Sequence, residues 1–346
     1  MALPLLVTMG DPAGIGPEIV VKSLLSRPDW RSDTVVVGDA AVLQRAMALV
    51  RPDRGSALDA MPLVELSSLA ALPAAPPGAL VFVQGCVAGA LPAWGRVDGV
   101  AGRMAADCIE WAARQVLHGH ARAMVTAPVH KEALAAAGVE HPGHTEMLQA
   151  LAAEQAGVPV SAMPVRMMLS APGLATVLVS IHVALRTAIE AVSIESVFET
   201  IRITHEHFRR AGVDRPRIAV AGLNPHAGEG GLFGREEVDH IAPAIERALA
   251  LGLDVSGPHP PDTVFMRARQ GHFDVVVAMY HDQGLIPVKL LGVEHGVNTT
   301  LGLPMVRTSP DHGTAFDIAG TGRAGADSLM AAIEAARTAS RHQAGH

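Results

Sequence analysis

Three histidines in this sequence each follow a short apolar run. His182 ends the run TVLVSIH, His281 ends DVVVAMYH, and His226 comes shortly after RIAVAG, before a glycine-rich turn. Imidazoles are common ligands of divalent cations, and three of them leave positions open for water or substrate, which is typical of a catalytic metal site. For each histidine alone a helix cap or a loop residue is the simpler explanation, but the repeated context favours one shared metal ion. Asp282, next to His281, could orient that ring or act as a base.

A second group of residues has the chemistry of an anion site. His144 and Thr145 lie in GHTE, where a loop enters an expected helix and backbone N–H groups are free to hold an anion. Lys289 in PVKLLG, and Asn298 and Arg307 in GVNTTLGLPMVRTS, lie in stretches of low charge density, which favours a paired role. Together they suit a phosphate or a carboxylate. For GHTE, an ordinary helix cap formed by Thr145 stays open as the alternative.

The opening motif MGDPAGIGPEI places three glycines before an expected helix. Gly10, Gly14 and Gly16 precede Pro17, which a helix tolerates in its first turn because the missing N–H has no partner there. The spacing differs from the GxGxxG dinucleotide fingerprint. From these residues alone two interpretations stay open: a loop that lets a ligand approach the backbone at a helix N-terminus, or a tight turn.

The elements that must carry these residues alternate along the chain. Short runs rich in β-branched residues are separated by longer alanine- and leucine-rich stretches, which is typical of an α/β fold with a largely parallel sheet. Ligands of such sheets bind beyond the carboxyl ends of the strands, where the three histidines would fall. Two successive runs between residues 165 and 181 predict an antiparallel hairpin within the sheet. The expected strands are 4–9, 34–39, 79–84, 123–127, 165–170, 175–181, 217–222 and 274–280, and the expected helices are 17–26, 39–50, 100–117, 146–157, 193–212 and 236–252.

The composition argues against several classes of protein. With 346 residues, 49% of them hydrophobic and 18% charged, the chain is expected to form roughly two globular domains. A net charge of −7 argues against a general nucleic-acid binder, and no apolar run approaches the ~20 residues of a membrane span. The N-terminus lacks the basic start of a secretory signal, and the two cysteines form no CxxC pattern. A cytoplasmic protein that binds neither nucleic acid nor membrane is the simplest expectation.

Motifs near the two ends of the chain resemble those of a known superfamily. GDPAGIGPE near the start and HGTAFDIAGTGRA at 312–324 are similar to the opening motif and the nucleotide loop of isopropylmalate and isocitrate dehydrogenases. The inserted Pro12 and Ala13 depart from that pattern. With TAPVHK, GHTE, GLNPHAGEGG, AMYHDQG and GVNTTLGLP, the departure matches one branch over nearly the whole chain. The sequence therefore resembles the 4-hydroxythreonine-4-phosphate dehydrogenase family, including paralogues that act on 4-phospho-D-threonate or 4-phospho-D-erythronate.

The resemblance implies an isopropylmalate-dehydrogenase-like fold with two α/β/α domains and a cleft between them. The first domain would comprise residues 1–128 and 301–346, and the second residues 129–300. A homodimer is also implied, with an active site that uses residues of both subunits. The implied roles are metal ligation by His182, His226 and His281; substrate binding by His144, Thr145, Lys289, Asn298 and Arg307; and cofactor binding by His312, Gly313, Thr314, Ala315 and Asp317.

The implied reaction is oxidation of the C3 hydroxyl of 4-phosphooxy-L-threonine by NAD. Decarboxylation to 3-amino-2-oxopropyl phosphate follows, in vitamin B6 biosynthesis. One divalent cation per subunit (zinc, magnesium, manganese or cobalt) would lower the pKa of the hydroxyl and polarise the ketone. Asp317 can accept hydrogen bonds from ribose hydroxyls and would repel a 2′-phosphate, so NAD is favoured over NADP. Asp282 and Lys289 are the candidates for the proton acceptor.

Other functions stay open at this point. The same chemistry could act on 4-phospho-D-threonate or 4-phospho-D-erythronate. An unphosphorylated aromatic diol is a further candidate substrate, although HKEAL and GHTE count against it because a diol has no phosphate to hold. A metal-dependent hydrolase and a non-catalytic ligand-binding protein belong to different classes altogether.

Overall fold

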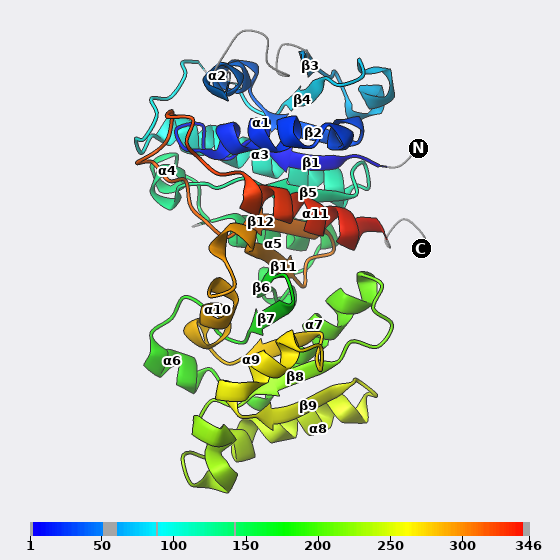
Figure 1. The fold of residues 1–346 in the computed structure, drawn as a ribbon, viewed down its shortest axis with the longest axis vertical. Helices are drawn as coiled ribbons and strands as arrows, with labels where there is room; N and C mark the ends of the chain where they lie inside the picture. Colours follow the sequence, from blue (N-terminus) through cyan, green and yellow to red (C-terminus); the bar gives the residue numbers. More distant parts are fainter. Residues whose placement is uncertain (1–2, 51–60, 88, 142, 342–346) are drawn as a thin grey trace. The chain divides into compact units, whose positions relative to one another are not determined.

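Two compact units make up the part of the chain that the computed structural model describes, residues 3–50, 61–87, 89–141 and 143–341. Unit 1 is Met1–Pro164 with Leu303–Ser340, and unit 2 is Val165–Gly302 (Figure 1). The expected boundary lay at residue 128, but α4 (Lys131–Ala136) and α5 (His144–Ala156) pack on α3 (Gly99–Leu117), so 129–164 belong to unit 1. Of the expected first domain, residues 51–60 and 342–346 lie outside the described residues.

Unit 1 contains a parallel sheet in the order β3-β4-β2-β1-β5-β12. Every residue of β1, β2, β5 and β12 is buried, as in a sheet that is covered on both faces. The carboxyl ends of these strands lie at one edge, where the loops that carry the opening motif and residues 312–324 begin. The strands are β1 (Leu5–Thr8), β2 (Thr34–Gly38), β3 (Leu63–Glu65), β4 (Leu80–Gln84), β5 (Ala123–Thr126) and β12 (Val306–Pro310).

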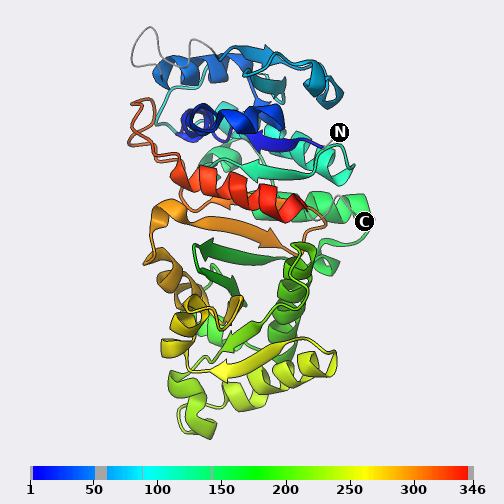
Figure 2. The same ribbon diagram turned by 45° about the vertical axis from the view of Figure 1, so that its right-hand side comes forward.

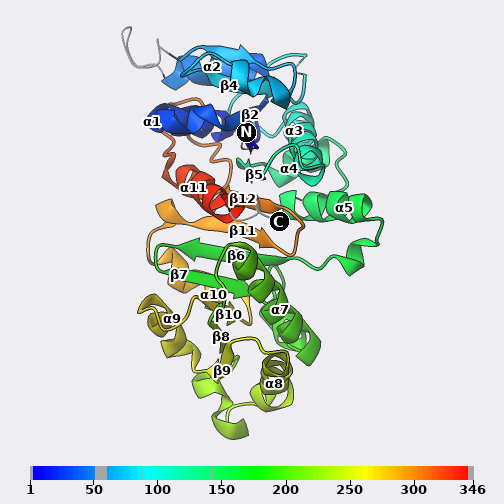
Figure 3. The same ribbon diagram turned by 90° about the vertical axis from the view of Figure 1, so that its right-hand side faces the viewer.

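Helices cover both faces of the unit 1 sheet (Figure 3). One face carries α1 (Gly16–Ser26), α2 (Ala40–Val50) and α11 (Asp327–Arg341), and the other carries α3, α4 and α5. Although α1 and α11 come from opposite ends of the chain, Figures 2 and 3 both show them on the same face. As expected, α1 begins with Pro17 in its first turn. Among the residues that the structure describes, no helix combines the length and apolar character needed to span a bilayer.

Unit 2 contains a mixed sheet in the order β11-β6-β7-β10-β8-β9. The predicted antiparallel hairpin is confirmed: β6 pairs antiparallel with β7, and also with β11, whereas the other pairs are parallel. The strands are β6 (Arg166–Ala171), β7 (Leu174–Leu178), β8 (Ile218–Ala221), β9 (Val255–His259), β10 (Val275–Ala278) and β11 (Val297–Leu301). The helices are α6 (Leu185–Glu190), α7 (Ile194–Arg210), α8 (Ala242–Ala250), α9 (Pro261–Arg269) and α10 (His281–Lys289).

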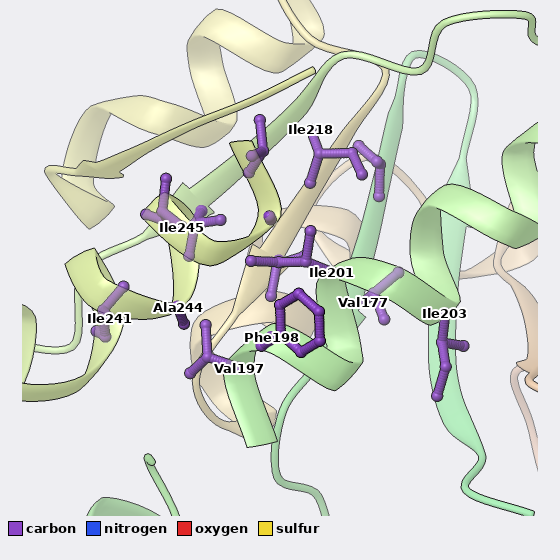
Figure 4. Packing of buried hydrophobic residues seen from close by; sticks show 14 of the residues in the cluster. Val177, Val197, Phe198, Ile201, Ile203, Ile218, Ile241, Ala244 and Ile245 are labelled. Carbon is purple, nitrogen blue, oxygen red and sulfur yellow. The ribbon is translucent and has the colours of Figure 1, made fainter. Parts of the chain in front are cut away.

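The alternation of side chains along β10 divides the core of unit 2 into two clusters. Val275 and Val277 point to one face and belong to a cluster with residues of α7 and α8. Figure 4 shows Phe198 and Ile201 of α7 and Ile245 of α8 in this cluster. Val276 and Ala278 point to the other face and pack with residues of α9 and α10. Because successive residues of a strand face opposite sides, one apolar run supplies both clusters. The buried strand is thereby held firmly enough to position the residue that follows it.

Four strands were not expected from the sequence: β3, β9, β11 and β12. The strands β11 (VNTTL) and β12 (VRTSP) carry polar residues in place of an apolar run, and β9 contains the cis peptide Gly257–Pro258. Burial of a polar strand is possible where its side chains find partners, and Thr308 of β12 donates to the carbonyl oxygen of Ala332 at 2.7 Å. The expected helix 236–252 begins as a single π-helical turn, Glu237–Ile241, before α8.

Candidate active site

Two histidines line a pocket of about 420 Å³ in unit 2. His182 follows β7, and His281 is the first residue of α10, directly after β10. These strands are parallel neighbours, with Val276 opposite Thr176, so their carboxyl ends bring the two side chains together. The ring centroids lie 5.8 Å apart with the planes inclined by 46°. The other lining residues are Ile181, Val183, Leu185, Ala188, Tyr280 and Asp282.

Asp282 fixes the protonation of the His281 ring. Its Oδ1 lies 2.7 Å from Nδ1 of His281. A neutral ring therefore carries its hydrogen on Nδ1 and donates a hydrogen bond from there to the carboxylate. The lone pair then remains on Nε2. A carboxylate behind a histidine is the arrangement that orients metal-ligating imidazoles and raises their basicity.

His226 lies in the loop Pro225–Gly231 (η4), which follows β8, the neighbour of β10. It begins a series of five residues with φ between 47° and 77°. The carboxylate of Glu237 holds this loop, because its Oε1 accepts from the backbone N–H groups of Leu223 and Asn224, each at 2.7 Å. A Cβ at position 228 would lie 2.6 Å from Glu237 Oε2, so glycine is required there. Gly228 thus leaves room for the buried carboxylate of Glu237 and also adopts the positive φ that the turn requires.

Within one chain, only two of the three expected metal ligands come together. The ring centroid of His226 lies 6.2 Å from that of Phe233, not beside the His182–His281 pair. In the described part of a single chain, no group of three or more His, Cys, Asp or Glu side chains is arranged to hold a metal ion. A metal site that joins all three histidines therefore stays a prediction for the assembled protein.

Arg307 is the buried cation of unit 1. It lies on β12 with 3% of its surface exposed and donates from Nε (3.1 Å) and Nη2 (2.7 Å) to Oγ1 of Thr126, at the end of β5. Burial lowers the pKa of the guanidinium to about 10, while the nearby Glu146 raises it. The group therefore stays charged at neutral pH, and its expected role in holding an anion stays a prediction.

His144 lies close enough to Arg307 to feel its charge. Burial lowers the pKa of His144 well below its usual value, and the positive charge of Arg307 lowers it further, so the ring is neutral at pH 7. Its Nε2 is buried without a hydrogen-bond partner among the described residues. His144 and Thr145 open α5, whose N-cap is Gly143 with no side-chain cap, so the alternative of a capping Thr145 is wrong. This helix N-terminus, with Arg307, is suited to an anion.

Lys289 and Asn298, the other expected substrate residues, belong to unit 2. Lys289 is the last residue of α10, the helix that begins with His281, and its side chain is exposed. Asn298 lies on β11 opposite Leu169 of β6, and it is partly buried. The sequence analysis placed both in stretches of low charge density without assigning an element, and the structure puts them on a helix end and a strand.

The two motifs at opposite ends of the chain meet in unit 1. The backbone N–H of Ile15 donates to the carbonyl oxygen of Thr314 at 3.0 Å. A Cβ at Gly14 would lie 2.9 Å from both Cβ and the carbonyl oxygen of Thr314, so glycine permits this close approach. Gly14 thus lets another backbone segment, the loop expected to bind the nucleotide, approach the first turn of α1, and both interpretations of the opening motif stay predictions.

The expected cofactor residues lie in the loop between β12 and α11. Thr314 is buried, Gly313 and Asp317 are exposed, and His312 Nδ1 lies 3.1 Å from the carbonyl oxygen of Gly313. Ala315 has a φ of 43°, a conformation that costs a non-glycine residue free energy and persists only where the surroundings enforce it. Next to it, the ring of Phe316 stacks on that of His130 with centroids 4.6 Å apart.

Asp11 of the opening motif is a fully buried carboxyl group that sequence analysis did not single out. Its Oδ1 accepts from the backbone N–H of Ala13 at 2.8 Å, and its own N–H donates to the carbonyl oxygen of Pro128 at 2.9 Å. Burial raises its pKa to about 6, and hydrogen bonds from backbone N–H groups only partly oppose this. The carboxyl joins the glycine-rich turn to the segment after β5.

Comparison with known proteins identifies the family. The family described as pyridoxal phosphate biosynthetic protein PdxA matches residues 30–336. The chain belongs to the PdxA family. A 4-hydroxythreonine-4-phosphate dehydrogenase of Beijerinckia indica is 53% identical over 96% of this chain and 93% of its own length. A D-threonate 4-phosphate dehydrogenase of Salmonella typhimurium is 46% identical over 95% of this chain and 97% of its own. The crystal structure of 4-hydroxythreonine-4-phosphate dehydrogenase from Klebsiella pneumoniae is 42% identical, covers 98% of this chain and 100% of that one, and has a TM-score of 0.85.

These relatives confirm the family resemblance and the α/β isopropylmalate-dehydrogenase-like fold class expected from the motifs. Because close relatives over nearly the whole length are dehydrogenases, the chain is an oxidoreductase of the PdxA type. A hydrolase or a non-catalytic binding protein is thereby set aside. The likeness covers 98% of the chain, so it includes both units and all the residues discussed above.

Sequence reasoning missed several residues that shape this PdxA-family site. Thr126 lies near the end of an expected strand, and its partner Arg307 is 181 positions away in sequence. Glu237 lies near the start of an expected helix, and its partners are backbone N–H groups, which no side-chain pattern reveals. Asp11 and Glu18 lie in the opening motif, in which the glycine spacing is the more conspicuous feature. The spacing of Glu18 and Lys22 at i and i+4 on the first helix was an available signal of a pair, and the structure shows it at 2.7 Å.

Proposed function

We propose that this PdxA-family chain is a metal- and NAD-dependent dehydrogenase. Its proposed reaction is oxidation of the C3 hydroxyl of 4-phosphooxy-L-threonine followed by loss of carbon dioxide, on the route to pyridoxal 5′-phosphate. The observation that supports the proposal most directly is the pair His182 and His281 at the ends of adjacent parallel strands, with Asp282 on Nδ1 of His281. Relatives named for this reaction support the choice of substrate.

The donor set of the histidine pair fits a divalent cation. Asp282 holds the proton on Nδ1 of His281, which leaves an imidazole nitrogen with a lone pair for ligation. A bound cation would supply a Lewis acid for the substrate hydroxyl and, after oxidation, for the ketone. Of the proposed cations zinc, magnesium, manganese and cobalt, imidazole ligands suit zinc better than magnesium or manganese, which prefer oxygen ligands. His182 and His281 are the two ligands that one chain offers together, and His226 is proposed as the third.

We infer that His226 completes the metal site from a second copy of the chain. Apolar side chains lie exposed beside the pocket and beside the His226 loop, among them Leu185 (58% exposed) and Leu232 (73%). Exposed apolar residues grouped in this way favour burial against another protein surface. In a two-fold symmetric dimer each copy would give its His226 to the other, so both sites would be equivalent.

The proposed substrate contacts divide by charge. Arg307, charged and buried, with neutral His144 and the N-terminus of α5 at Thr145, would bind an anionic group of the substrate. Lys289 and Asn298 are proposed as further contacts to the phosphate or the carboxylate. Binding of both anionic groups would hold the C3–H bond against the nicotinamide. Holding the reacting groups in this geometry lowers the entropic part of the activation barrier.

Two residues remain candidates for accepting the hydroxyl proton. Asp282 already accepts from His281 Nδ1, so we propose that its main role is to orient the ring. Lys289, at the opposite end of the same helix, α10, is the other candidate.

The loop between β12 and α11 is the proposed NAD site. Exposed Asp317 is suited to accept hydrogen bonds from the ribose hydroxyls, and its charge would repel the 2′-phosphate of NADP. The segment approaches the first turn of α1 at Thr314, where backbone N–H groups lie close. His312, Gly313 and Ala315 complete the proposed contacts.

A second candidate substrate is 4-phospho-D-threonate, together with its C2 epimer 4-phospho-D-erythronate. The 46% identity to a D-threonate 4-phosphate dehydrogenase supports it. The chemistry at C3 is unchanged, and only the group at C2 and its configuration differ.

The deciding experiment measures NADH absorbance at 340 nm. Purified protein would be incubated with NAD, each divalent metal in turn, and 4-phosphooxy-L-threonine, 4-phospho-D-threonate or 4-phospho-D-erythronate. We expect NADH formation with 4-phosphooxy-L-threonine and release of carbon dioxide in equal amount. The highest kcat/KM on a phosphosugar acid would replace the proposed substrate by the second candidate. Absence of NADH with every substrate and metal would overturn the dehydrogenase proposal.

A further inference from the structure

Lys22 joins α1 to the far end of the proposed cofactor loop. Its Nζ donates to Oε1 of Glu18 and to the carbonyl oxygens of Gly322 and Ala324, each at 2.7 Å. An ammonium group has three N–H donors, so all its donors are used. Two of the three acceptors are backbone carbonyl oxygens about 300 positions away in sequence. Lys22 therefore fixes the C-terminal end of the loop against α1.

Glu18 holds the same segment from the acceptor side. Its carboxylate is buried, with 2% of the residue exposed, and Oε1 accepts from the backbone N–H of Ala324 at 2.9 Å as well as from Lys22. Glu18 and Lys22 thus bind both the N–H and the carbonyl of Ala324. A buried carboxylate paired in this way is costly to leave alone, because its charge has no water to stabilise it.

The other end of the loop is tied to the same helix. The carbonyl of Thr314 accepts from Ile15, just before α1, and between the two ties Ala315 has a φ of 43°. Trp94 packs on the loop at Gly320, where an added Cβ would lie 2.2 Å from its ring. A segment that contains an unfavourable backbone conformation keeps it only if both ends are held.

We propose that Lys22 and Glu18 are positioning residues that set the affinity of the loop for NAD. This inference rests on the proposed function, because it takes the loop 312–324 as the cofactor site. Neither side chain need touch the nucleotide. We call the hydrogen bonds of Glu18 and Lys22 to Gly322 and Ala324 the clasp. With the clasp intact, Asp317 and Gly313 keep one arrangement before NAD binds. The free energy of binding then does not have to offset the entropic cost of ordering these two residues.

The test compares Lys22→Met, the double variant Glu18→Gln/Lys22→Met, and Arg114→Met as a control. Arg114 lies in the same unit and forms exposed ion pairs with Glu110 on α3 and Glu154 on α5. The double variant removes both charges, so no buried carboxylate is left unpaired, and it serves if Lys22→Met does not fold. Calorimetric Kd for NAD, the KM for NAD and for the phosphorylated substrate, and kcat would be measured for each.

We expect Kd and KM for NAD to rise about tenfold or more in both clasp variants, in line with the effect of small misplacements on a site. The kcat at saturating NAD and the KM for the phosphorylated substrate should stay within about twofold, and Arg114→Met should match the wild type. Equal NAD affinity in the folded clasp variants, or a fall in kcat without a rise in KM for NAD, would overturn the inference. A wild-type protein that does not bind NAD would instead overturn the proposed cofactor, and the inference with it.

Discussion

At the scale of single residues, the site is governed by burial of charge. Asp11, Arg307 and His144 lie in unit 1 with pKa values shifted mainly by loss of water. Their directions differ with chemistry: the carboxyl group is pushed towards its neutral form, the imidazole is held neutral, and the guanidinium stays charged. Two of these groups yield predictions.

Replacement of Asp11 by Asn should raise the stability of the protein at pH 8. Burial raises the pKa of Asp11 from 3.8 to about 6, so the folded state holds its proton more tightly than the unfolded state. The favourable contribution of the neutral carboxyl group is present below about pH 4 and is lost as the pH rises through 6. Asparagine can still accept the Ala13 hydrogen bond without ionising. Urea unfolding at pH 8 should show a gain of at most about 3 kcal/mol, and at pH 4 almost none; the same gain at both pH values would contradict the burial argument.

Replacement of Arg307 by Lys should weaken substrate binding despite the retained charge. The planar guanidinium donates twice to Thr126 Oγ1, and an ammonium cannot reproduce that forked geometry. We expect KM for the phosphorylated substrate to rise about tenfold or more, with KM for NAD little changed. Arg122→Lys is the matched control, because Arg122 pairs with Asp33 in the same unit. An unchanged KM in Arg307→Lys would remove Arg307 from the proposed substrate site.

At the scale of elements, the His226 loop shows how a short segment is held for chemistry. Six successive residues, 226–231, have positive φ, which costs free energy at the three that are not glycine. The hydrogen bonds to Glu237 compensate for part of that cost. Gly228 is packed against that carboxylate, whereas a Cβ at Gly230 would meet nothing within 4 Å. The two glycines have similar φ values, 77° and 68°, so they form a natural pair for comparison.

Gly228→Ala should reduce metal affinity and activity, because the added Cβ would displace Glu237 and with it the loop of His226. Gly230→Ala carries a comparable backbone cost of about 1 kcal/mol without the clash. Metal titration by calorimetry and thermal unfolding would be measured for both variants. We expect metal binding to weaken about tenfold or more in Gly228→Ala only. Equal losses in the two variants would show that backbone strain alone, and not the Glu237 contact, controls the loop.

At the scale of the whole molecule, the proposed metal site depends on assembly. One chain brings His182 and His281 together and leaves His226 apart. The proposal that a second copy supplies His226 predicts complementation between inactive variants. In a mixed dimer of His182→Ala and His226→Ala, one site has both substitutions and the other has none.

Mixing His182→Ala with His226→Ala, after mild dissociation and reassociation, should restore up to about a quarter of wild-type activity, since half of random dimers are mixed and each has one intact site. The control mixture is His182→Ala with His281→Ala, in which every site lacks one ligand and no activity returns. Activity would be followed as NADH formation, with sedimentation to confirm exchange. Restoration in both mixtures, or in neither, would contradict a site shared in this way.

Much of the fold followed from local patterns. Apolar runs predicted β1, β2, β4, β5, β7, β8 and β10, and the paired runs at 165–181 predicted the β6–β7 hairpin. These predictions were possible because the pattern of apolar residues that marks a buried strand lies within one short segment. The strands β11 and β12 were missed because they bury polar residues, among them the threonines of both strands and Arg307, whose contact with Thr126 only the folded chain supplies. Local sequence contains no record of such partners.

The sequence by itself determined which residues could do chemistry: the histidines after apolar runs, the opening glycines, and the motifs that imply the PdxA family. It could not determine which of them meet, because convergence depends on strand order and on loops held by distant groups. Tertiary structure alone decided that His182 pairs with His281, and that the loop of His226 is held by Glu237. It likewise decided that the two motifs at the chain ends are bound together through Ile15, Glu18 and Lys22. The physical reason is that these contacts join residues far apart in sequence, whose approach only the folded chain can bring about.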